Sequence, residues 1–378
     1  MRILLIGEYS RLHNSLKEGL EKLGNEVIIL GFKDGFKNFP VDFPLEKKWD
    51  TGLLKKVKVA LYTILGFDAS SYLTYRQFEK NKAKFTGFDV VQLINENSFY
   101  CQYYFEKKIL EFLFQNNKKT FLLSSGYDYL NVKYCFENPN FKSAIQHFLS
   151  RKIKESSFKN VLKYRTKPFE KLHQFIYSNV QGIIATDMDY HIPLIGNSKY
   201  LGLIPNPINV NKLGFQPIAI SDKIVIFHGI NNDNYYKKGN NYFEKALEII
   251  QAKYSDKIDV ISSRSIPYNQ YIKLYDKAHI LLDQVYAHDQ GYNALEAMSK
   301  GKVVFTGAEK EFVNHYKLTE RVCISALPDV DYLVNELSFL IENPNEIIAI
   351  GKRARAFIEK EHDYTKIAEQ YLETWKSK

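Results

Sequence analysis

The sequence has 378 residues, of which 45% are hydrophobic and 15% aromatic, and a formal net charge of +9. This length predicts two domains, each with its own core, and the composition excludes a disordered chain. Cys101, Cys135 and Cys323 form no CxxC pair, so we expect buried packing residues in a reducing compartment rather than a disulfide framework or a zinc site.

The positive charge lies in the first half of the chain. Residues 1–200 contain 30 Lys or Arg and 20 Asp or Glu, whereas residues 201–378 contain 22 and 23. A basic first half favours an anionic partner such as a membrane surface, a polyanionic glycan or a lipid pyrophosphate, and an evenly solvated basic surface is the alternative. Because no recognised nucleic-acid-binding module accompanies the charge, we expect no nucleic acid partner.

Three segments bear on membrane contact. Residues 3–6 are shorter than the apolar core of a signal peptide, and residues 59–67 are too short to span a bilayer, so we expect a cytoplasmic protein. Residues 151–173 intersperse Lys and Arg with Phe, Tyr, Leu and Ile. Such basic amphipathic segments lie on anionic membranes, which makes peripheral binding to the inner face of the cell membrane a hypothesis; an ordinary exposed helix is the alternative.

The first half of the chain begins with a strand, a turn and a helix. Residues 2–6 are an apolar run, Gly7 turns the chain, and leucines from Leu12 to Leu23 mark one helix face. This order predicts a parallel sheet with helices on its faces, and the absence of a full GxGxxG disfavours a nicotinamide cofactor. Further strands are predicted at 27–30, 89–94, 121–123, 182–186 and 201–204, helices at 51–66, 71–84 and within 141–177, and a long cleft-facing loop at 31–50.

Polar residues follow two of these strands. Asn95 and Glu96 come after the strand at 89–94, and Tyr127 and Asp128 come after the strand at 121–123. Residues beyond the carboxyl ends of parallel strands commonly line a ligand crevice. Helix capping at 95–98 and turn formation at Asp128 are the competing explanations.

The PNP stretch at 205–207 predicts the boundary between a domain of residues 1–206 and one of residues 207–362. Just beyond it, KIVIFHG at 223–229 echoes RILLIG at 2–7, so a second Rossmann-like domain is expected. Its strands are predicted at 258–261, 278–283, 303–305 and 322–325, its helices at 242–252, 292–300 and much of 329–360, and a last helix carries an apolar stripe from Tyr364 to Trp375.

Residues 278–307 predict a strand, a glycine-containing loop, a short helix and another strand. The first N–H groups of a helix lack intrahelical partners and favour anions such as phosphate. Glu296 comes one turn into this helix, on the face of Tyr292 and Asn293, and an ionised carboxylate accepts two hydrogen bonds from a ribose diol. The stretch therefore predicts a nucleotide site.

The sequence GYNALEAMSKGKVVFTG at 291–307 resembles the donor-sugar motif of the retaining glycosyltransferases of family 4 (glycosyl transferases group 1). The resemblance implies an α/β GT-B fold, with two Rossmann-like domains facing across a cleft and a C-terminal helix, 363–378, crossing back to the first domain. It also implies that residues 1–206 bind the acceptor and residues 207–362 bind the donor.

The activity that the resemblance implies is transfer of a sugar, with retention, from a UDP- or GDP-linked nucleotide sugar to a glycan or lipid-linked acceptor, in cell-surface polysaccharide or glycoconjugate assembly. No cofactor and no metal ion are implied. A GT-B nucleotide-sugar epimerase or phosphorylase, or a non-catalytic glycan-binding relative, remains the alternative.

The resemblance assigns donor-site roles residue by residue. Glu296 matches the second acid of the motif, which binds the ribose, whereas His288 stands where the family has its first glutamate. Either Asp289 substitutes for that glutamate or His288 contacts the sugar itself. Lys238 matches the phosphate-binding lysine that neutralises the leaving group. The remaining donor-side candidates are Gly291, Tyr292, Asn293 and Arg264.

On the acceptor side, the SSGYDYL loop occupies the position where relatives often carry a catalytic histidine or acid. Asp128 is the candidate there, to orient an acceptor hydroxyl or to accept its proton. Asn95, Glu96 and Tyr127 are the neighbouring acceptor-side candidates.

Overall fold

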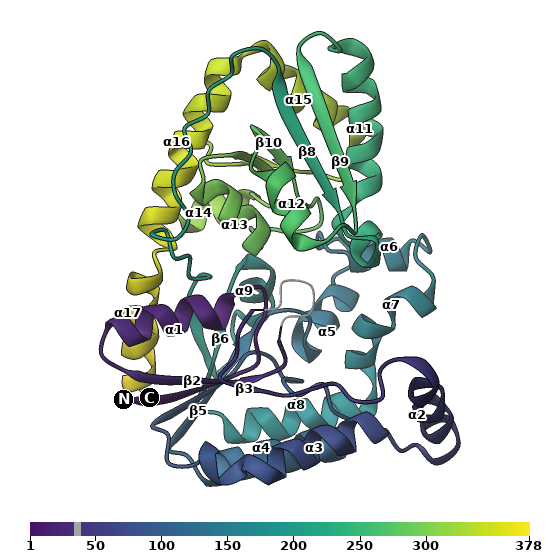
Figure 1. Cartoon of the computed structure of the whole chain (residues 1–378), viewed down its shortest axis with the longest axis vertical. Helices are drawn as coiled ribbons and strands as arrows, with labels where there is room; N and C mark the ends of the chain where they lie inside the picture. Colours follow the sequence, from purple (N-terminus) through teal and green to yellow (C-terminus); the bar gives the residue numbers. More distant parts are fainter. Residues whose placement is uncertain (34–38) are drawn as a thin grey trace.

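The computed structural model describes residues 1–33 and 39–378 and contains two α/β domains, one above the other in Figure 1. Each domain is built on a parallel sheet with helices on its faces, and the last helix returns to the first domain. The predicted α/β GT-B architecture is confirmed. Residues 34–38, part of the predicted loop at 31–50, lie outside the described residues.

The sheet of the first domain has seven strands in the order β3-β2-β1-β4-β5-β6-β7. Because helices cover both faces, its central strands are continuous apolar runs instead of alternating ones. The strands are β1 (Arg2–Ile6), β2 (Glu26–Gly31), β3 (Phe43–Pro44), β4 (Val90–Leu93), β5 (Lys119–Ser124), β6 (Gly182–Ala185) and β7 (Tyr200–Leu203).

The helices of the first domain are α1 (Leu12–Lys22), α2 (Gly52–Leu65), α3 (Ala69–Asn81), α4 (Tyr103–Gln115), α5 (Tyr129–Glu137), α6 (Ile145–Leu149), α7 (Glu155–Leu162), α8 (Lys167–Asn179) and α9 (Met188–Leu194). Strand β3 was not predicted. It pairs Phe43 with Leu30 and Pro44 with Gly31 at the sheet edge, where the missing N–H of proline is tolerated, and two residues are too few to produce a periodic pattern.

The second sheet has five parallel strands in the order β12-β11-β10-β8-β9. These are β8 (Ile224–Ile230), β9 (Ile258–Arg264), β10 (Ile280–Leu282), β11 (Val303–Thr306) and β12 (Ile324–Ser325). Its helices are α10 (Tyr235–Lys238), α11 (Asn240–Lys253), α12 (Tyr268–Tyr275), α13 (Tyr292–Ser299), α14 (Lys310–His315), α15 (Val330–Glu342) and α16 (Pro344–Glu361).

Helix α17 (Tyr364–Lys376) lies against α1 and covers part of the first sheet. Trp375 is fully buried, with its ring 6.3 Å from that of Phe121 on β5. The two helices approach closely because Gly19 has no side chain: a Cβ there would lie 2.3 Å from the carbonyl oxygen of Tyr364. The C-terminal crossing therefore depends on a glycine in the first helix.

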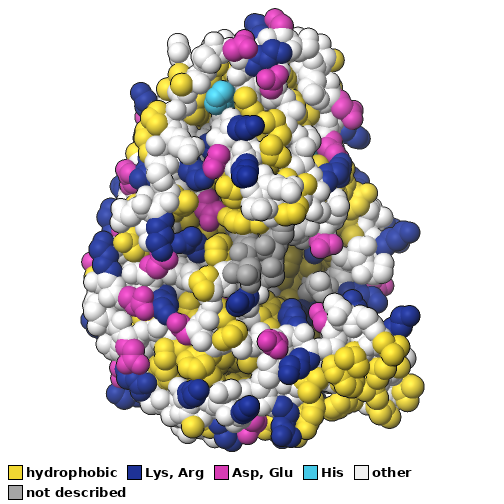
Figure 2. Space-filling view, viewed as in Figure 1, with side chains coloured by type: hydrophobic (Ala, Val, Ile, Leu, Met, Phe, Trp, Pro, Cys, Tyr) yellow, Lys and Arg dark blue, Asp and Glu magenta, His cyan; other side chains and the backbone are white. Residues whose placement is uncertain are grey.

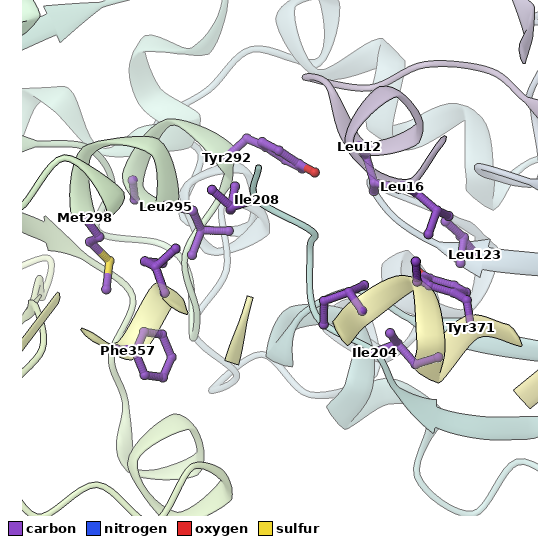
Figure 3. Close-up of a cluster of buried hydrophobic side chains, with 14 of the residues drawn as sticks. Leu12, Leu16, Leu123, Ile204, Ile208, Tyr292, Leu295, Met298, Phe357 and Tyr371 are labelled. Carbon is purple, nitrogen blue, oxygen red and sulfur yellow. The ribbon is translucent and has the colours of Figure 1, made fainter. Parts of the chain in front are cut away.

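One hydrophobic cluster runs through both domains (Figure 3). It joins Leu16 of α1 and Tyr371 of α17 to Leu295 of α13. Tyr292 points from α13 toward α1, and its hydroxyl donates to the carbonyl of Pro207, with 2.6 Å between the oxygens. The two domains thus share a core on this side.

The basic segment at 151–173 has its apolar side chains inside the protein. Phe158, Val161 and Leu172 are buried, the first two in a small cluster that also contains Val132 of α5. Packing within the domain therefore accounts for its amphipathic pattern, and no broad apolar face is left on it for a membrane. None of the helices described here has the length and apolar character needed to cross a bilayer.

Candidate functional site

A cavity of about 360 Å³ lies between the two domains. Its first-domain wall comes from loops that follow β1, β5 and β6, including Tyr9, Gly126 and Asp187, and its second-domain wall is Gly291 and Tyr292. Figure 2 shows the surface hollowed between the upper and lower domains. The carboxyl ends of three parallel strands thus meet the start of α13, as expected for a ligand crevice in this class of fold.

Helix α13 begins at this cavity with no side chain capping it. Gly291 is its N-cap residue, and the Gly291 carbonyl accepts from the N–H groups of Ala294 and Leu295. The N–H groups of Tyr292 and Asn293 have no intrahelical acceptor, because no carbonyl of the helix lies far enough before them. With the helix dipole, this terminus favours an anion.

Lys238, at the end of α10, forms an ion pair with Asp283. The Lys238 Nζ lies 2.7 Å from Asp283 Oδ1, and the Asn293 side-chain amide donates to the same oxygen at 3.0 Å. The other Asp283 oxygen is buried and has no hydrogen-bond partner among the described residues. The network therefore ties the predicted phosphate lysine to the first turn of α13 through an acid that immediately follows β10.

Glu296 lies in the second turn of α13 and is only 8% exposed. Its charge acts on Tyr268, whose pKa is raised to about 12 first by burial and then by Glu296, while Arg11 acts in the opposite direction. Arg11 belongs to the first domain, where it follows β1 with a φ of 83°. A cation of the first domain and the predicted ribose-binding acid of the second thus act on the same tyrosine, while Arg11 itself pairs with Glu18.

His288 lies at the contact between the domains and is buried. Its ring stacks on Phe141 with 4.3 Å between the ring centres, and its backbone N–H donates to the Asp189 carboxylate at 3.1 and 3.2 Å. Neither ring nitrogen has a hydrogen-bond partner within the described parts of the chain, although Nδ1 lies 3.7 Å from the Glu311 carboxylate.

Asp289 is buried and lies at the domain contact with two half-buried acids of the first domain, Asp187 and Asp189. Its carboxylate accepts from the N–H groups of Met188, at 3.3 Å, and Gln290, at 2.7 Å. Burial, together with the nearby charge of Asp189, raises the pKa of Asp289 to about 7, against the opposing effect of the Gln290 and Met188 N–H groups. Burial also raises the pKa of Asp187 and Asp189. Both of these acids follow the carboxyl end of β6. This position could have identified them in the sequence as candidate site residues.

On the acceptor side, Asp128 caps α5. Its carboxylate accepts from the Asn131 N–H at 2.7 Å and from the Ser124 hydroxyl. Burial, and then the charge of Glu96, raise its pKa to about 7. Helix capping is a structural role other than the turn formation given as the alternative for this residue, and the predicted catalytic role stays a prediction.

Glu96 and Asn95 are buried and hold neighbouring segments in place. The Glu96 carboxylate accepts from the Tyr129 N–H at 3.1 Å and lies 2.6 Å from His173 Nδ1. The Asn95 amide donates to the carbonyls of Ser125 and Tyr127 at 3.0 and 3.1 Å. Asn95 therefore positions the loop that walls the cavity, and Tyr127 is half-buried within that loop. Their contact with an acceptor stays a prediction.

Arg264 is not among the residues that line the interdomain cavity. It pairs with Glu244 of α11 and lies over the Tyr235 ring, 5.5 Å from its centre, with half of its side chain exposed. Its predicted role in donor binding is untested.

A second cavity of about 540 Å³ lies in the first domain. Glu8, Lys33, Lys47, Ser98 and Tyr100 contribute to its wall, together with residues 44–46. Lys47 lies over the Tyr100 ring, 4.3 Å from its centre. This cavity offers charged and aromatic groups of the kind that hold polar or anionic ligands.

This chain is similar in sequence to one family model and in structure to several solved proteins. Residues 235–373 match a family model described as glycosyl transferase-like. Sucrose-phosphate synthase of Thermosynechococcus elongatus is similar in structure with a TM-score of 0.64 at 16% identity, over 100% of this chain and 98% of that chain. HepE of Anabaena, in complex with UDP and glucose, gives 0.59 at 13% identity, over 100% of both chains.

A putative UDP-N-acetylglucosamine 2-epimerase of Listeria monocytogenes gives a TM-score of 0.57 at 12% identity, over 100% of this chain and 95% of that chain. No curated protein sequence matches the chain. The predicted resemblance to GT-B glycosyltransferases is confirmed by the family match and by the fold.

Proposed function

We propose that this chain, whose second domain matches the glycosyl transferase-like family and whose fold is that of GT-B glycosyltransferases, moves a sugar from a nucleoside diphosphate sugar to an acceptor. The observation that carries the proposal is the uncapped start of α13 at the interdomain cavity, with Glu296 one turn further along the same helix. The HepE complex with UDP and glucose supports a UDP-linked donor, and a GDP-linked donor is the alternative.

In this proposal the donor diphosphate lies at the first N–H groups of α13, and Glu296 accepts hydrogen bonds from the ribose. Negative charge grows on the diphosphate as the sugar departs, so fixed N–H groups and Lys238 stabilise the transition state more than the ground state. Lys238 is held by Asp283 at 2.7 Å, within the network that reaches Asn293. The residues of the chain supply the positive potential, and no metal ion is part of the proposal.

The sugar of the donor would contact His288. Both ring nitrogens of His288 are buried without a hydrogen-bond partner in the described structure, and sugar hydroxyl groups would satisfy them. We propose retention of the anomeric configuration, with the acceptor attacking from the face that the diphosphate leaves. NMR assignment of the product anomer tests this point, and an inverted product would exclude it.

The acceptor would bind on the first domain, which carries the positive net charge. Lys33 and Lys47 line the 540 Å³ cavity together with Glu8 and Glu46, so it is the net charge of the whole domain that favours an anionic glycan or a lipid-linked acceptor. We propose cell-surface polysaccharide or glycoconjugate assembly, on the cytoplasmic side of the membrane, as the setting.

The donor site is tested by calorimetric titration of UDP and GDP into the wild type and the Glu296→Ala variant. Since hydrogen bonds to a charged group contribute about 1.5–3 kcal/mol each, we expect Glu296→Ala to weaken the preferred nucleotide by at least about tenfold. Glu248→Ala, at an exposed position on α11, is the matched control and leaves affinity unchanged. A folded Glu296→Ala protein with wild-type affinity would remove the assignment.

Epimerisation of a nucleotide sugar is the second candidate, because a putative 2-epimerase shares the fold and because Asp289 has a pKa of about 7, suited to proton transfer at neutral pH. Incubation of nucleotide sugars without an acceptor separates the two. A new epimer of the donor, detected by NMR, supports epimerisation. An intact donor that is consumed only when an acceptor is added supports transfer.

A further inference from the structure

Helix α2 stands clear of the first domain, at the lower right of Figure 1. None of its 14 residues is buried, although most are apolar. Leu53, Ile64 and Leu65 are 75%, 78% and 68% exposed. Apolar surface concentrated on one element in this way marks a site of interaction.

Seven apolar residues of α2 are gathered on one side, while Val59 and Tyr62 lie outside this sector. At 100° per residue, the sector that contains Leu53, Leu54, Val57, Ala60, Leu61, Ile64 and Leu65 is about 140° wide. Lys56 and Lys58 flank this sector on its two edges, and Lys55 lies on the far side. Figure 2 shows the resulting apolar patch at the lower right of the molecule, with basic side chains at its border.

A helix of this length is marginal by itself in water and is normally stabilised by packing of its apolar face. Among the helices and strands that the structure describes, α3 alone is in substantial contact with α2, and most apolar side chains of α2 remain exposed. No described part of the chain therefore packs over this apolar face of α2.

We infer that α2 docks on the surface of an anionic lipid bilayer. Residues 51–67 contain three lysines and no Asp or Glu. Lys58 is paired with Asp50 at 2.7 Å, whereas Lys55 and Lys56 are exposed, and charge complementarity between these two lysines and lipid phosphates favours a bilayer. The leucines and isoleucine enter the boundary between head groups and acyl chains, while the exposed Lys55 and Lys56 extend to the head groups. A symmetric contact between two copies would bring the lysine-flanked faces together, and the like charges oppose it.

Docking through α2 has a consequence for the acceptor that rests on the proposed function. The segment that precedes α2 includes Pro44, Leu45, Glu46 and Lys47, which line the 540 Å³ cavity. A bilayer-bound α2 therefore brings this cavity near the membrane surface. A lipid-linked acceptor with an anionic head group would reach the cavity without leaving the bilayer.

Cosedimentation of the full chain with vesicles tests the docking. We expect binding at low salt to vesicles of phosphatidylcholine mixed with phosphatidylglycerol, and at least about tenfold weaker binding to phosphatidylcholine alone. The variant L53S/I64S/L65S should lose at least about tenfold in binding to the anionic vesicles. The control I195S/I249S/F339S changes three exposed apolar residues elsewhere and should bind as the wild type does.

The variant K55E/K56E/K58E separates the charge contribution. It should also bind anionic vesicles at least about tenfold more weakly, whereas K245E/K257E/K273E, at exposed positions of the second domain, should show a smaller loss. Wild-type protein that fails to bind anionic vesicles, or an L53S/I64S/L65S variant that binds them normally, overturns the inference. So does a lipid-free dimer, seen by light scattering, that L53S/I64S/L65S dissociates, because α2 would then join two copies.

Nucleotide titration without lipid keeps this inference distinct from the proposed function. Normal UDP or GDP binding together with absent vesicle binding excludes docking and leaves the transferase proposal standing. Vesicle binding by a protein that binds neither UDP nor GDP supports docking through α2 and excludes the transferase proposal.

Discussion

Lys238 forms an ion pair with the buried carboxylate of Asp283. In the proposed reaction the same ammonium group also contacts the diphosphate of the donor. Asp283 is 1% exposed at its side chain and depends on Lys238 and Asn293 for its partners. Removing Lys238 therefore has a structural effect as well as an effect on binding. A substitution of this lysine alone does not separate the two.

A double-mutant design separates them. We expect Lys238→Met to lower the free energy of unfolding by about 1–3 kcal/mol, because the Asp283 carboxylate loses its charged partner. Adding Asp283→Asn should restore most of that stability but not the affinity for UDP or GDP. Denaturant unfolding and calorimetric titration measure the two effects. Full recovery of nucleotide affinity in the double variant would argue against a direct phosphate contact by Lys238.

Asp128 allows a prediction about pH. Its pKa is about 7 in the folded protein against an ordinary value of 3.8, so between about pH 4 and pH 7 the folded state holds a proton that the unfolded state has lost. Its contribution therefore makes stability fall as pH rises through this window. Asp128→Asn keeps both hydrogen-bond partners and should reduce the fall by up to about 1.4 kcal/mol per pH unit in mid-window.

Urea unfolding of both proteins at several pH values checks this expectation. Identical pH profiles would show that Asp128 ionises in the folded state at its ordinary pKa. A large loss of transfer activity in a stable Asp128→Asn protein would favour the predicted catalytic role over capping alone.

At the scale of elements, the C-terminal helix depends on how closely it can approach α1. The sequence shows that helix α17 carries an apolar stripe, but not that this stripe packs against α1. That packing depends on Gly19, which lets the two helices approach, and on the chain contact near residue 208. Ile208 donates its N–H to the His362 carbonyl at 2.7 Å and accepts from the Tyr364 N–H at 3.2 Å. These bonds fasten the start of α17 where the two domains meet.

Gly19→Ala should destabilise the protein by about 1–3 kcal/mol, because the new Cβ meets backbone of Tyr364 at 2.3 Å and overpacked contacts force the helices apart. Gly214→Ala is the control, since a Cβ there meets nothing within 4 Å. Thermal unfolding measures both variants. Equal melting temperatures would mean that α17 shifts without loss of packing.

At the scale of the whole molecule, the two domains share a core and enclose a cavity beside it, and Leu12 and Tyr292 belong to both. The cluster that contains Leu16, Leu295 and Tyr371 crosses the domain boundary, and the Tyr292 hydroxyl bonds to Pro207 within it. A shared core couples the stabilities of the domains. Closure of the two domains around a ligand would take place at this cavity.

We therefore predict a single cooperative unfolding transition, with a calorimetric enthalpy equal to the van't Hoff enthalpy. A saturating nucleotide that binds the native state should raise the midpoint of that one transition. Scanning calorimetry with and without UDP measures both quantities. Two resolved transitions would show that the domains unfold independently despite the common cluster.

The strands, the helices and the apolar stripe of the terminal helix were predicted from periodicity, because local geometry repeats at the spacing of buried side chains. The second parallel sheet was predicted from the similarity of residues 223–229 to residues 2–7, and the return of the last helix to the first domain from the resemblance to GT-B glycosyltransferases. Strand β3 was missed because it is two residues long and stabilised only by its neighbour. The position of Glu296 in the second turn of the helix that begins after Gly291 was likewise predicted from the sequence, because the two residues belong to one helix.

The sequence by itself determined that α2 is helical and apolar, that Lys238 is a candidate cation and that acids follow the strands. Only the tertiary structure decided that α2 has no cover, that Lys238 faces Asp283 and that Asp187, Asp189 and Asp289 meet across the domain contact. The physical reason is that a hydrophobic period reports which face of an element avoids water, whereas the partner of that face, and the burial that raises a carboxyl pKa, depend on segments distant in the chain.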